Sequence, residues 1–213
     1  MTQAAHETEQ AVRRTSDIIF DLAQGPPTDA VAVADIILAF GDRSFGLAML
    51  LLAAVNCVPL PMPVGVSTPT GAVMMVFAVQ LALGRPRPWL PARVLARTMR
   101  RSQVARVARA IVPRLRRIER VLRPRLPALV EGAGERVAGW ACVVLAALLM
   151  LPIPFANFLP AVAIVLFSLG IVEKDGVLVA IAYVAMLAAL AWIAAIGWVA
   201  ILAALMLVGA IFE

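Results

Sequence analysis

Three long stretches without a charged residue constrain this chain more than any other feature. They cover residues 44 to 84, 137 to 172 and 177 to 212 of a 213-residue sequence in which 62% of the residues are hydrophobic. A soluble core of this size does not need such stretches. The sequence therefore predicts an all-α fold, that of a polytopic helical membrane protein.

Prolines divide the first stretch, at NCVPLPMPVGVSTPTGAV (residues 56 to 73). The apolar pieces on either side, residues 44 to 58 and 70 to 84, would each reach only about 22 Å as a helix. A crossing of the hydrocarbon core needs about 20 residues, and the prolines prevent one continuous helix. We expect a hairpin of two short helices, whose tip is either re-entrant or a plain turn outside the bilayer.

The second stretch contains a related break. LPIPFANFLPA at residues 151 to 161 repeats one leucine and three prolines of LPMPVGVSTPT at residues 60 to 70, all at an offset of 91 residues. We interpret this as an internal repeat of two proline-broken hairpins, either parallel or inverted. Paired broken helices point to a transporter-like site near the bilayer midplane.

Polar side chains at the breaks and on the following helix are the candidate site. The alternative is that they only make hydrogen bonds between helices. The candidates are Asn56, Ser67, Thr68, Gln80 and Asn157.

Charge is distributed very unevenly. Residues 1 to 43 carry three Arg against seven acidic residues, whereas residues 85 to 136 carry fifteen Arg against three Glu. In this Arg-rich segment apolar residues recur at helical spacing, which is typical of an amphipathic helix on an anionic membrane surface and not of a nucleic-acid-binding segment. Basic loops stay in the cytoplasm, so we expect a cytoplasmic location for this segment. The candidate contacts for lipid headgroups are Arg43, Arg85, Arg114, Arg116, Arg117 and Arg120.

The two ends of the chain complete the predicted organisation. Residues 1 to 43 contain two apolar patterns of helical spacing, at 12 to 23 and 29 to 40, and predict amphipathic surface helices. Residues 173 to 213 hold an uncharged run of about 54 Å as a helix, enough for two crossings. We expect a closing helical hairpin that turns near Trp192, Gly197 and Trp198. Its small residues are compatible with contact between copies in a homo-oligomer, such as a dimer.

The sequence favours a protein that is not an enzyme. The uncharged stretches contain no acid for acid–base work. The single histidine, His6, lies in a polar terminus, and Cys57 and Cys142 are far apart in sequence. We therefore predict no catalytic residue, no metal site and no cofactor.

Several short motifs together resemble the ExoD family of bacterial inner-membrane proteins. These are GxRxFG (residues 41 to 46), PxPxGxSTxxG (residues 61 to 71), Gln80 with Gly84, and WLP (residues 89 to 91). The resemblance implies an inner-membrane location and a role in exopolysaccharide production or envelope stress tolerance. It supplies no catalytic mechanism.

Two functional hypotheses follow. In the first, the paired breaks bind or move a lipid or lipid-linked saccharide. In the second, the protein is a non-transporting accessory or regulatory protein, whose Arg-rich helix binds anionic lipid or synthesis partners.

Overall fold

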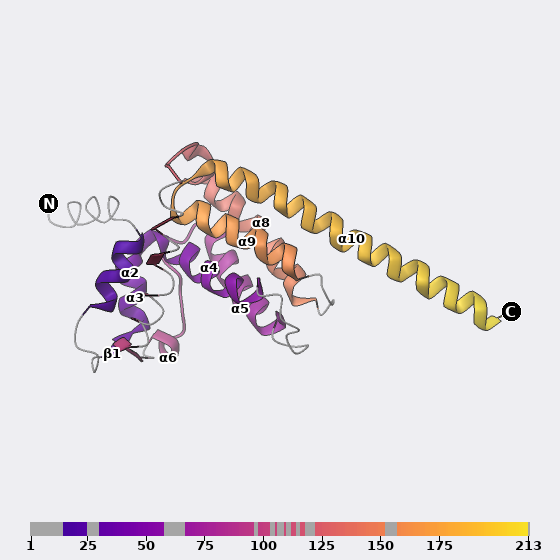
Figure 1. Cartoon of the computed structure of the whole chain (residues 1–213), viewed down its shortest axis with the longest axis horizontal. Coiled ribbons are helices and arrows are strands. Elements are labelled where there is room, and N and C mark those ends of the chain that lie inside the picture. The colour runs from indigo at the N-terminus through magenta and orange to yellow at the C-terminus, as the bar shows by residue number, and fades with distance from the viewer. Residues whose placement is uncertain are drawn as a thin grey trace.

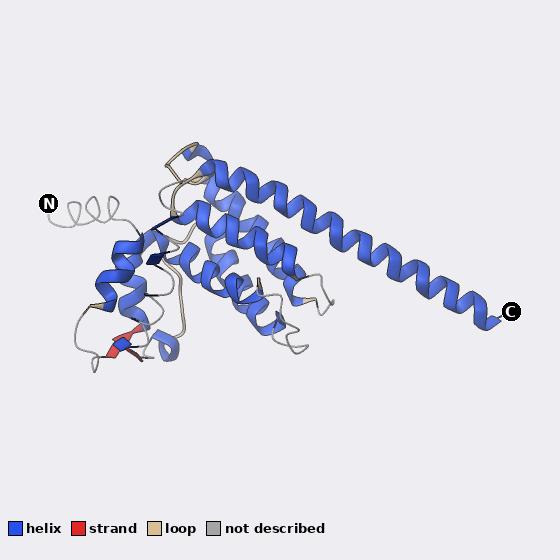
Figure 2. Cartoon of the chain, viewed as in Figure 1, coloured by secondary structure: helices blue, strands red, loops and turns tan. Residues whose placement is uncertain are grey.

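The computed structural model describes most of the chain: residues 15–24, 30–57, 67–95, 98–102, 105, 109, 112–113, 116–117, 122–151 and 157–212. These residues are mostly helical, as the sequence predicts (Figures 1 and 2). A short antiparallel pair of strands, β1 (Ala30–Ala32) and β2 (Thr98–Arg100), was not expected. It joins the N-terminal region to the Arg-rich segment.

Four helices from the first two apolar stretches pack side by side, and we call them the bundle. They are α4 (Ser44–Asn56), α5 (Ser67–Ala82), α8 (Ala133–Met150) and α9 (Phe158–Val172). Helix α5 packs along α8, and α4 packs along α9, so the first helix of each predicted hairpin lies against the second helix of the other (Figure 1). Their shared core contains the fully buried side chains Phe45, Met49, Met74, Leu145, Leu149 and Phe167.

Glycines set how closely these pairs approach. A Cβ added at Gly139 of α8 would lie 2.5 Å from the backbone nitrogen of Ala82, at the end of α5. A Cβ added at Gly46 of α4 would lie 2.6 Å from a methyl group of Val172, at the end of α9. Both pairs are therefore antiparallel, with backbones close enough that a glycine is needed at the contact.

The helix ends that flank the two proline breaks lie at one end of the bundle. Helices α4 and α8 end there, α5 and α9 begin there, and the Thr68 hydroxyl donates to the Met150 carbonyl at 3.4 Å across the two hairpins. We call this the break end, and the opposite end the charged end. The two hairpins are thus parallel, although the segments that join their helices, residues 58–66 and 152–156, lie outside the described residues. The internal repeat itself stays a prediction.

The predicted closing hairpin is wrong, because α10 is one continuous helix from Gly176 to Phe212. Its first half packs on α9, and its second half extends beyond the bundle (Figure 1). The expected turn contains no proline, and the single Gly197 costs only about 1 kcal/mol relative to alanine in a helix. That cost is too small to end the helix at this point.

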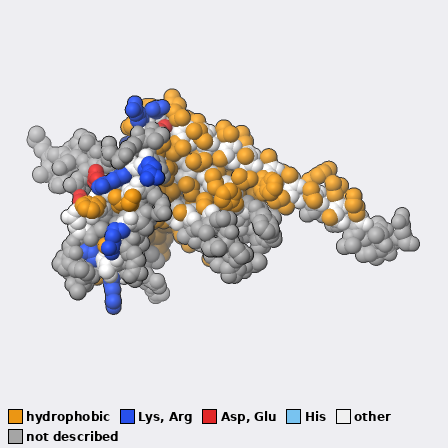
Figure 3. Space-filling view, viewed as in Figure 1, with side chains coloured by type: hydrophobic (Ala, Val, Ile, Leu, Met, Phe, Trp, Pro, Cys, Tyr) orange, Lys and Arg blue, Asp and Glu red, His pale blue; other side chains and the backbone are white. Residues whose placement is uncertain are grey.

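Two of the described helices are long and apolar enough to cross a membrane, judged by length and composition. They are Ala133–Met150 and Gly176–Ala203. Helices α4, α5 and α9 are apolar but shorter, as the proline breaks predict. On the face shown in Figure 3, hydrophobic side chains cover much of the bundle and α10, whereas Lys and Arg side chains gather at the end that holds the N-terminal helices and the start of α10.

The N-terminal region forms two short helices, α2 (Thr15–Ala23) and α3 (Val33–Phe40), close to the predicted positions. A 3-10 turn, η1 (Gly41–Arg43), leads from α3 into α4. Ile18 and Phe40 pack with Leu47 of α4 in a small separate cluster. In the Arg-rich segment the structure defines α6 (Ala92–Leu95), β2 and the 3-10 turn η2 (Pro127–Leu129).

Candidate functional site

Polar side chains at the break end mostly bond within the protein. The Asn56 amide nitrogen donates to the Leu52 carbonyl at 3.0 Å, and the Thr70 hydroxyl donates to the Asn56 amide oxygen at 3.3 Å. The Thr68 hydroxyl donates a hydrogen bond to the Met150 carbonyl. These contacts correspond to the alternative interpretation, in which polar groups at the breaks satisfy helix ends and hold helices together.

Asn157 differs from these residues. It precedes the first residue of α9, and its buried Oδ1 has no hydrogen-bond partner among the described residues. The buried Ser168 hydroxyl, farther along α9, also has none in the described part of the chain. The side chain of Ser67 lies outside the described residues. The structure therefore brings together Asn56, Thr68 and Asn157 at one end of the bundle.

Gln80 lies at the other end of α5, about 18 Å along the helix from Thr68. Its Oε1 accepts from the Trp89 backbone nitrogen at 2.6 Å, and its Nε2 donates to the Trp89 carbonyl at 3.2 Å. Both polar backbone groups of Trp89 are therefore held by one buried amide. This clamp folds the segment after α5 back against the helix. Gln80 is therefore not part of the group of polar residues at the break end.

Helices α5 and α9 end in the same kind of turn. After α5, Gly84 has φ +70° and the Arg85 nitrogen donates to the Gln80 carbonyl at 3.1 Å. After α9, Lys174 has φ +52° and the Asp175 nitrogen donates to the Gly170 carbonyl at 2.9 Å. This is the Schellman arrangement, in which the residue with positive φ is usually glycine. A lysine there costs roughly 1 kcal/mol of backbone strain.

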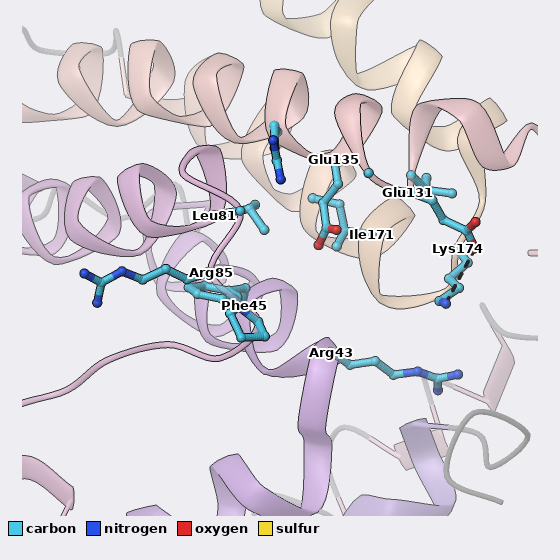
Figure 4. A pocket seen from close by; sticks show the side chains of 13 residues that line it. Arg43, Phe45, Leu81, Arg85, Glu131, Glu135, Ile171 and Lys174 are labelled. Carbon is cyan, nitrogen blue, oxygen red and sulfur yellow. Dashed lines mark ion pairs between the residues drawn. The ribbon is translucent and has the colours of Figure 1, made fainter. Parts of the chain in front are cut away.

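A cavity of about 330 Å³ opens between these turns at the charged end (Figure 4). All four helices of the bundle contribute to it, through the start of α4, the end of α5, the segment that leads into α8 and the end of α9. Its floor is apolar and buried, formed by Phe45, Leu81, Val130 and Ile171. Its rim carries the charged side chains Arg43, Arg85, Glu131, Glu135, Arg136 and Lys174. An apolar floor under a charged rim suits an amphiphilic molecule, and the volume lies near the lower limit for ligand pockets.

The rim has more positive than negative charge, with four cationic side chains against two carboxylates. Lys174 pairs with Glu131 at 3.6 Å. Glu135 points into the space between helices near Leu81 and Ile171, whereas Arg85 extends outward on the far side from Glu131 and Lys174 (Figure 4). Among the described residues, no carboxylate lies within ion-pair distance of the Arg85 or Arg136 guanidinium.

Gly84 has a second role at this rim. A Cβ added at this position would lie 2.6 Å from Nε of Arg136 and 3.0 Å from its Cζ. The Arg136 guanidinium therefore rests against the backbone of the turn from which Arg85 extends. A larger residue at position 84 would displace that guanidinium and strain the turn.

Asp175 fixes the start of α10 beside the cavity. This buried carboxylate accepts hydrogen bonds from the backbone nitrogens of Arg123 (3.1 Å), Val177 (3.0 Å) and Leu178 (3.4 Å). It thus caps α10 and ties the helix to the end of the Arg-rich segment. The sequence shows only a charged turn here, but an aspartate directly before a long apolar helix is the usual signal of such a cap.

The candidate arginines are only partly described. Arg116 pairs with Asp17 of α2 at 3.4 Å and lies 5.8 Å from the centre of the Phe20 ring. Arg101 donates to the Gln24 carbonyl just after α2. Arg117 is exposed, and Arg114 and Arg120 lie outside the described residues. Part of the Arg-rich segment is therefore docked on the acidic N-terminal region.

The sequence identifies only two of the cavity's charged residues, Arg43 and Arg85. It misses Glu131, Glu135 and Arg136, which lie together just before the second apolar stretch, and Lys174, which follows that stretch. What the sequence offers for these four residues is their position, because each lies close to an end of an uncharged stretch. In the described part of the chain, no three His, Cys, Asp or Glu side chains group closely enough to hold a metal ion.

Comparison with known proteins decides the family. The family model described as "Exopolysaccharide synthesis, ExoD" matches residues 15–195. The chain belongs to the ExoD family. The matched region includes the bundle, both of its ends and the first half of α10, so the cavity lies within the part shared with the family.

Two curated relatives agree with this assignment. Protein ExoD of Rhizobium meliloti (strain 1021) is 32% identical over 188 residues, which are 86% of this chain and 78% of that protein. An uncharacterized protein of Synechocystis sp. is 31% identical over 163 residues, 76% of this chain and 75% of that protein. No solved structure matches the chain at a significant level. The resemblance read from the sequence motifs is confirmed, and ExoD family membership connects the chain with exopolysaccharide synthesis.

Proposed function

We propose that this ExoD family member is a multi-pass protein of the bacterial inner membrane that binds a lipid or lipid-linked saccharide used in exopolysaccharide synthesis. The observation that carries the proposal is the cavity at the charged end, with its apolar floor and charged rim. An amphiphile places its polar group at such a rim and keeps its chain in an apolar environment. The protein binds this molecule and does not transform it.

The charges and helix lengths support one orientation in the membrane. The charged end joins the Arg-rich segment, which the distribution of basic residues assigns to the cytoplasm. Helix α8 is about 27 Å long by its rise per residue, close to the thickness of the hydrocarbon core. The break end then lies toward the far leaflet, where short polar side chains bond to helix ends.

In this proposal the break end has a structural role. The hydroxyl of Thr68 and the amide of Asn56 are already used by protein partners. This differs from the hypothesis drawn from the sequence, which places the ligand at the breaks, and Asn157 is the residue there that retains an unused buried oxygen among the described residues.

A second candidate function rests on the Arg-rich segment. Its contacts with α2, through Arg116 and Arg101, hold basic residues beside the acidic N-terminal region. A segment held in this way could exchange its internal partner for anionic lipid or for a synthesis protein. The protein would then be an accessory without a lipid cavity of its own, and contact between copies through α10 would fit either function.

Mass spectrometry of lipids that remain bound to the purified protein tests the main proposal. We expect one amphiphile class to be retained by the natural sequence and lost from Leu81→Phe, which fills the floor of the cavity. Leu83→Phe is the matched control, because Leu83 lies two residues later and is 61% exposed. Circular dichroism establishes that both variants keep their helices. Failure of the natural protein to retain any amphiphile, or equal loss in the two variants, would contradict the proposal.

Measurement of exopolysaccharide output distinguishes the accessory function from lipid binding in the cavity. If neutralising Arg114, Arg116, Arg117 and Arg120 abolishes the output while Leu81→Phe leaves it intact, the accessory function is correct and the cavity is not the site.

A further inference from the structure

We infer that the cavity recognises a phosphate or diphosphate ester, and that Arg85 and Arg136 are its phosphate-binding residues. This inference rests on the proposed function and specifies the chemical class of the bound lipid. A phosphorylated polyprenyl lipid, free or carrying a saccharide, has the required group at the junction of its apolar and polar parts.

The first argument is the charge left uncompensated at the rim. Lys174 has Glu131 as its partner, but the guanidinium groups of Arg85 and Arg136 have no carboxylate within ion-pair distance in the described part of the chain. Guanidinium groups bind phosphate through two parallel hydrogen bonds and are less strongly hydrated than ammonium groups. The Arg136 guanidinium lies against Gly84 at the cavity mouth, whereas the Arg85 side chain extends outward and must turn toward the mouth to reach a phosphate bound there (Figure 4). A phosphate at this position would supply the missing negative charge.

The second argument is that the turn carrying Arg85 is held in place. Arg85 directly follows Gly84 in the Schellman turn, and the Gln80 amide clamps the Trp89 backbone on the other side. The Arg136 guanidinium rests against the same turn at Gly84. Holding the backbone of Arg85 and the guanidinium of Arg136 in position before the ligand arrives reduces the entropy lost on binding.

The third argument favours an ester over free inorganic phosphate. Directly inside the rim lie Phe45, Leu81 and Ile171, which offer contact to carbon atoms and nothing to a bare anion. Glu135 points toward Leu81 and Ile171 (Figure 4). Glu135 already makes an interaction within the protein, and its carboxylate has further lone pairs that can accept a hydrogen bond from a sugar hydroxyl attached to the phosphate. The cavity volume admits a headgroup, while the rest of the molecule lies outside it.

Equilibrium binding to the full-length protein in nanodiscs of neutral lipid tests the inference. The probes are a polyprenyl monophosphate, the corresponding polyprenol, and inorganic phosphate as a competitor. We expect the monophosphate to bind at least about tenfold more tightly than the polyprenol, because charge-assisted hydrogen bonds are the strong ones. Inorganic phosphate should compete only at far higher concentration.

Two double variants locate the phosphate. Arg85→Gln with Arg136→Gln should reduce the affinity for the monophosphate by about tenfold or more and leave the affinity for the polyprenol unchanged. The matched control, Arg87→Gln with Arg125→Gln, removes the same charge from exposed side chains outside the cavity lining. It should retain the monophosphate affinity.

Three results would overturn the inference. Equal binding of polyprenol and its monophosphate would show that the phosphate is not recognised. Equal weakening by the two double variants would assign the effect to general surface charge. Displacement of the lipid by inorganic phosphate at matching concentrations would identify a free-anion site. The first two results leave the proposed function standing if Leu81→Phe still reduces lipid binding. If the natural protein binds none of the amphiphiles, the proposed function itself is wrong.

Discussion

The break end and the charged end of the bundle are built from different chemistry. At the break end, α4 and α8 end shortly before prolines in the sequence, and short side chains such as Thr68 bond to backbone carbonyls. At the charged end, the chain turns tightly through Gly84 and Lys174, and charged side chains surround a cavity. The sequence repeats at the break end, with the 91-residue offset, but at the charged end the same offset aligns Phe45 with Arg136. In our proposal the break end, where the repeat is predicted, is a scaffold, and the charged end carries the candidate binding groups.

Matched glycine substitutions at the two ends of the α5–α8 contact should give the largest difference in the free energy of unfolding. Gly139→Ala brings a methyl group within 2.5 Å of the Ala82 backbone, which cannot move without shifting α5. We expect a loss of about 2 to 3 kcal/mol in the free energy of unfolding. Gly71→Ala at the break end meets the side chain of Met150 at 3.0 Å, its backbone nitrogen at 3.2 Å and the Ala146 carbonyl oxygen at 3.3 Å. These contacts are less tight than the one at Gly139, methionine is adaptable and alanine favours helix, so we expect a smaller loss of about 1 kcal/mol.

Reversible unfolding in mixed detergent micelles provides both values. Gly197→Ala is the control for helix propensity, since nothing lies within 4 Å of a Cβ at that position. Equal destabilisation by the substitutions at positions 139 and 71 would contradict the difference in packing between the two ends.

Removal of the Gln80 clamp should cost about 2 kcal/mol. In Gln80→Leu, the Trp89 backbone nitrogen and carbonyl lose their partners while leucine preserves much of the side-chain volume. The turn that carries Arg85 should loosen, so susceptibility of residues 85 to 91 to limited proteolysis should rise together with the loss of stability. A variant with normal stability and unchanged proteolysis would show that the clamp does not hold this turn.

Loss of the α10 cap should cost about 1 to 2 kcal/mol. Asp175→Ala removes the acceptor for three backbone nitrogens, and N-cap substitutions typically have this effect. Asp175→Asn keeps an acceptor oxygen and should recover most of the stability, as measured by the same detergent unfolding. If asparagine is as destabilising as alanine, the negative charge of Asp175 matters and the capping explanation is insufficient.

The smallest effect should come from the break end. Thr68→Val preserves shape and removes one hydroxyl whose acceptor, the Met150 carbonyl, is 3.4 Å away. Hydrogen bonds between membrane helices average roughly 0.6 kcal/mol, so the change in unfolding free energy should be of that size. A loss above about 2 kcal/mol would place this contact among the main determinants of the bundle.

The sequence predicts the short helices and their breaks because proline acts locally on the backbone. It does not predict that the hairpins are parallel, since helix pairing depends on close contacts such as that of Gly139 with Ala82, which no periodicity encodes. The closing hairpin fails for a related reason: Trp192, Gly197 and Trp198 resemble a turn, but nothing there prevents a helix. The cavity is hard to foresee because Arg85 and Arg136 are 51 positions apart and line the same cavity only through the packing of α5 on α8.

Exopolysaccharide output in a deletion strain, measured for variants of the two ends at equal membrane levels, tests the central claim most directly. The charged-end variant is Arg85→Gln with Arg136→Gln, and the break-end variant is Thr68→Val with Asn157→Ala. We predict that the charged-end variant loses most of the output and that the break-end variant keeps it. Normal output from the charged-end variant, together with loss in the break-end variant, would contradict the claim and return the site to the proline breaks.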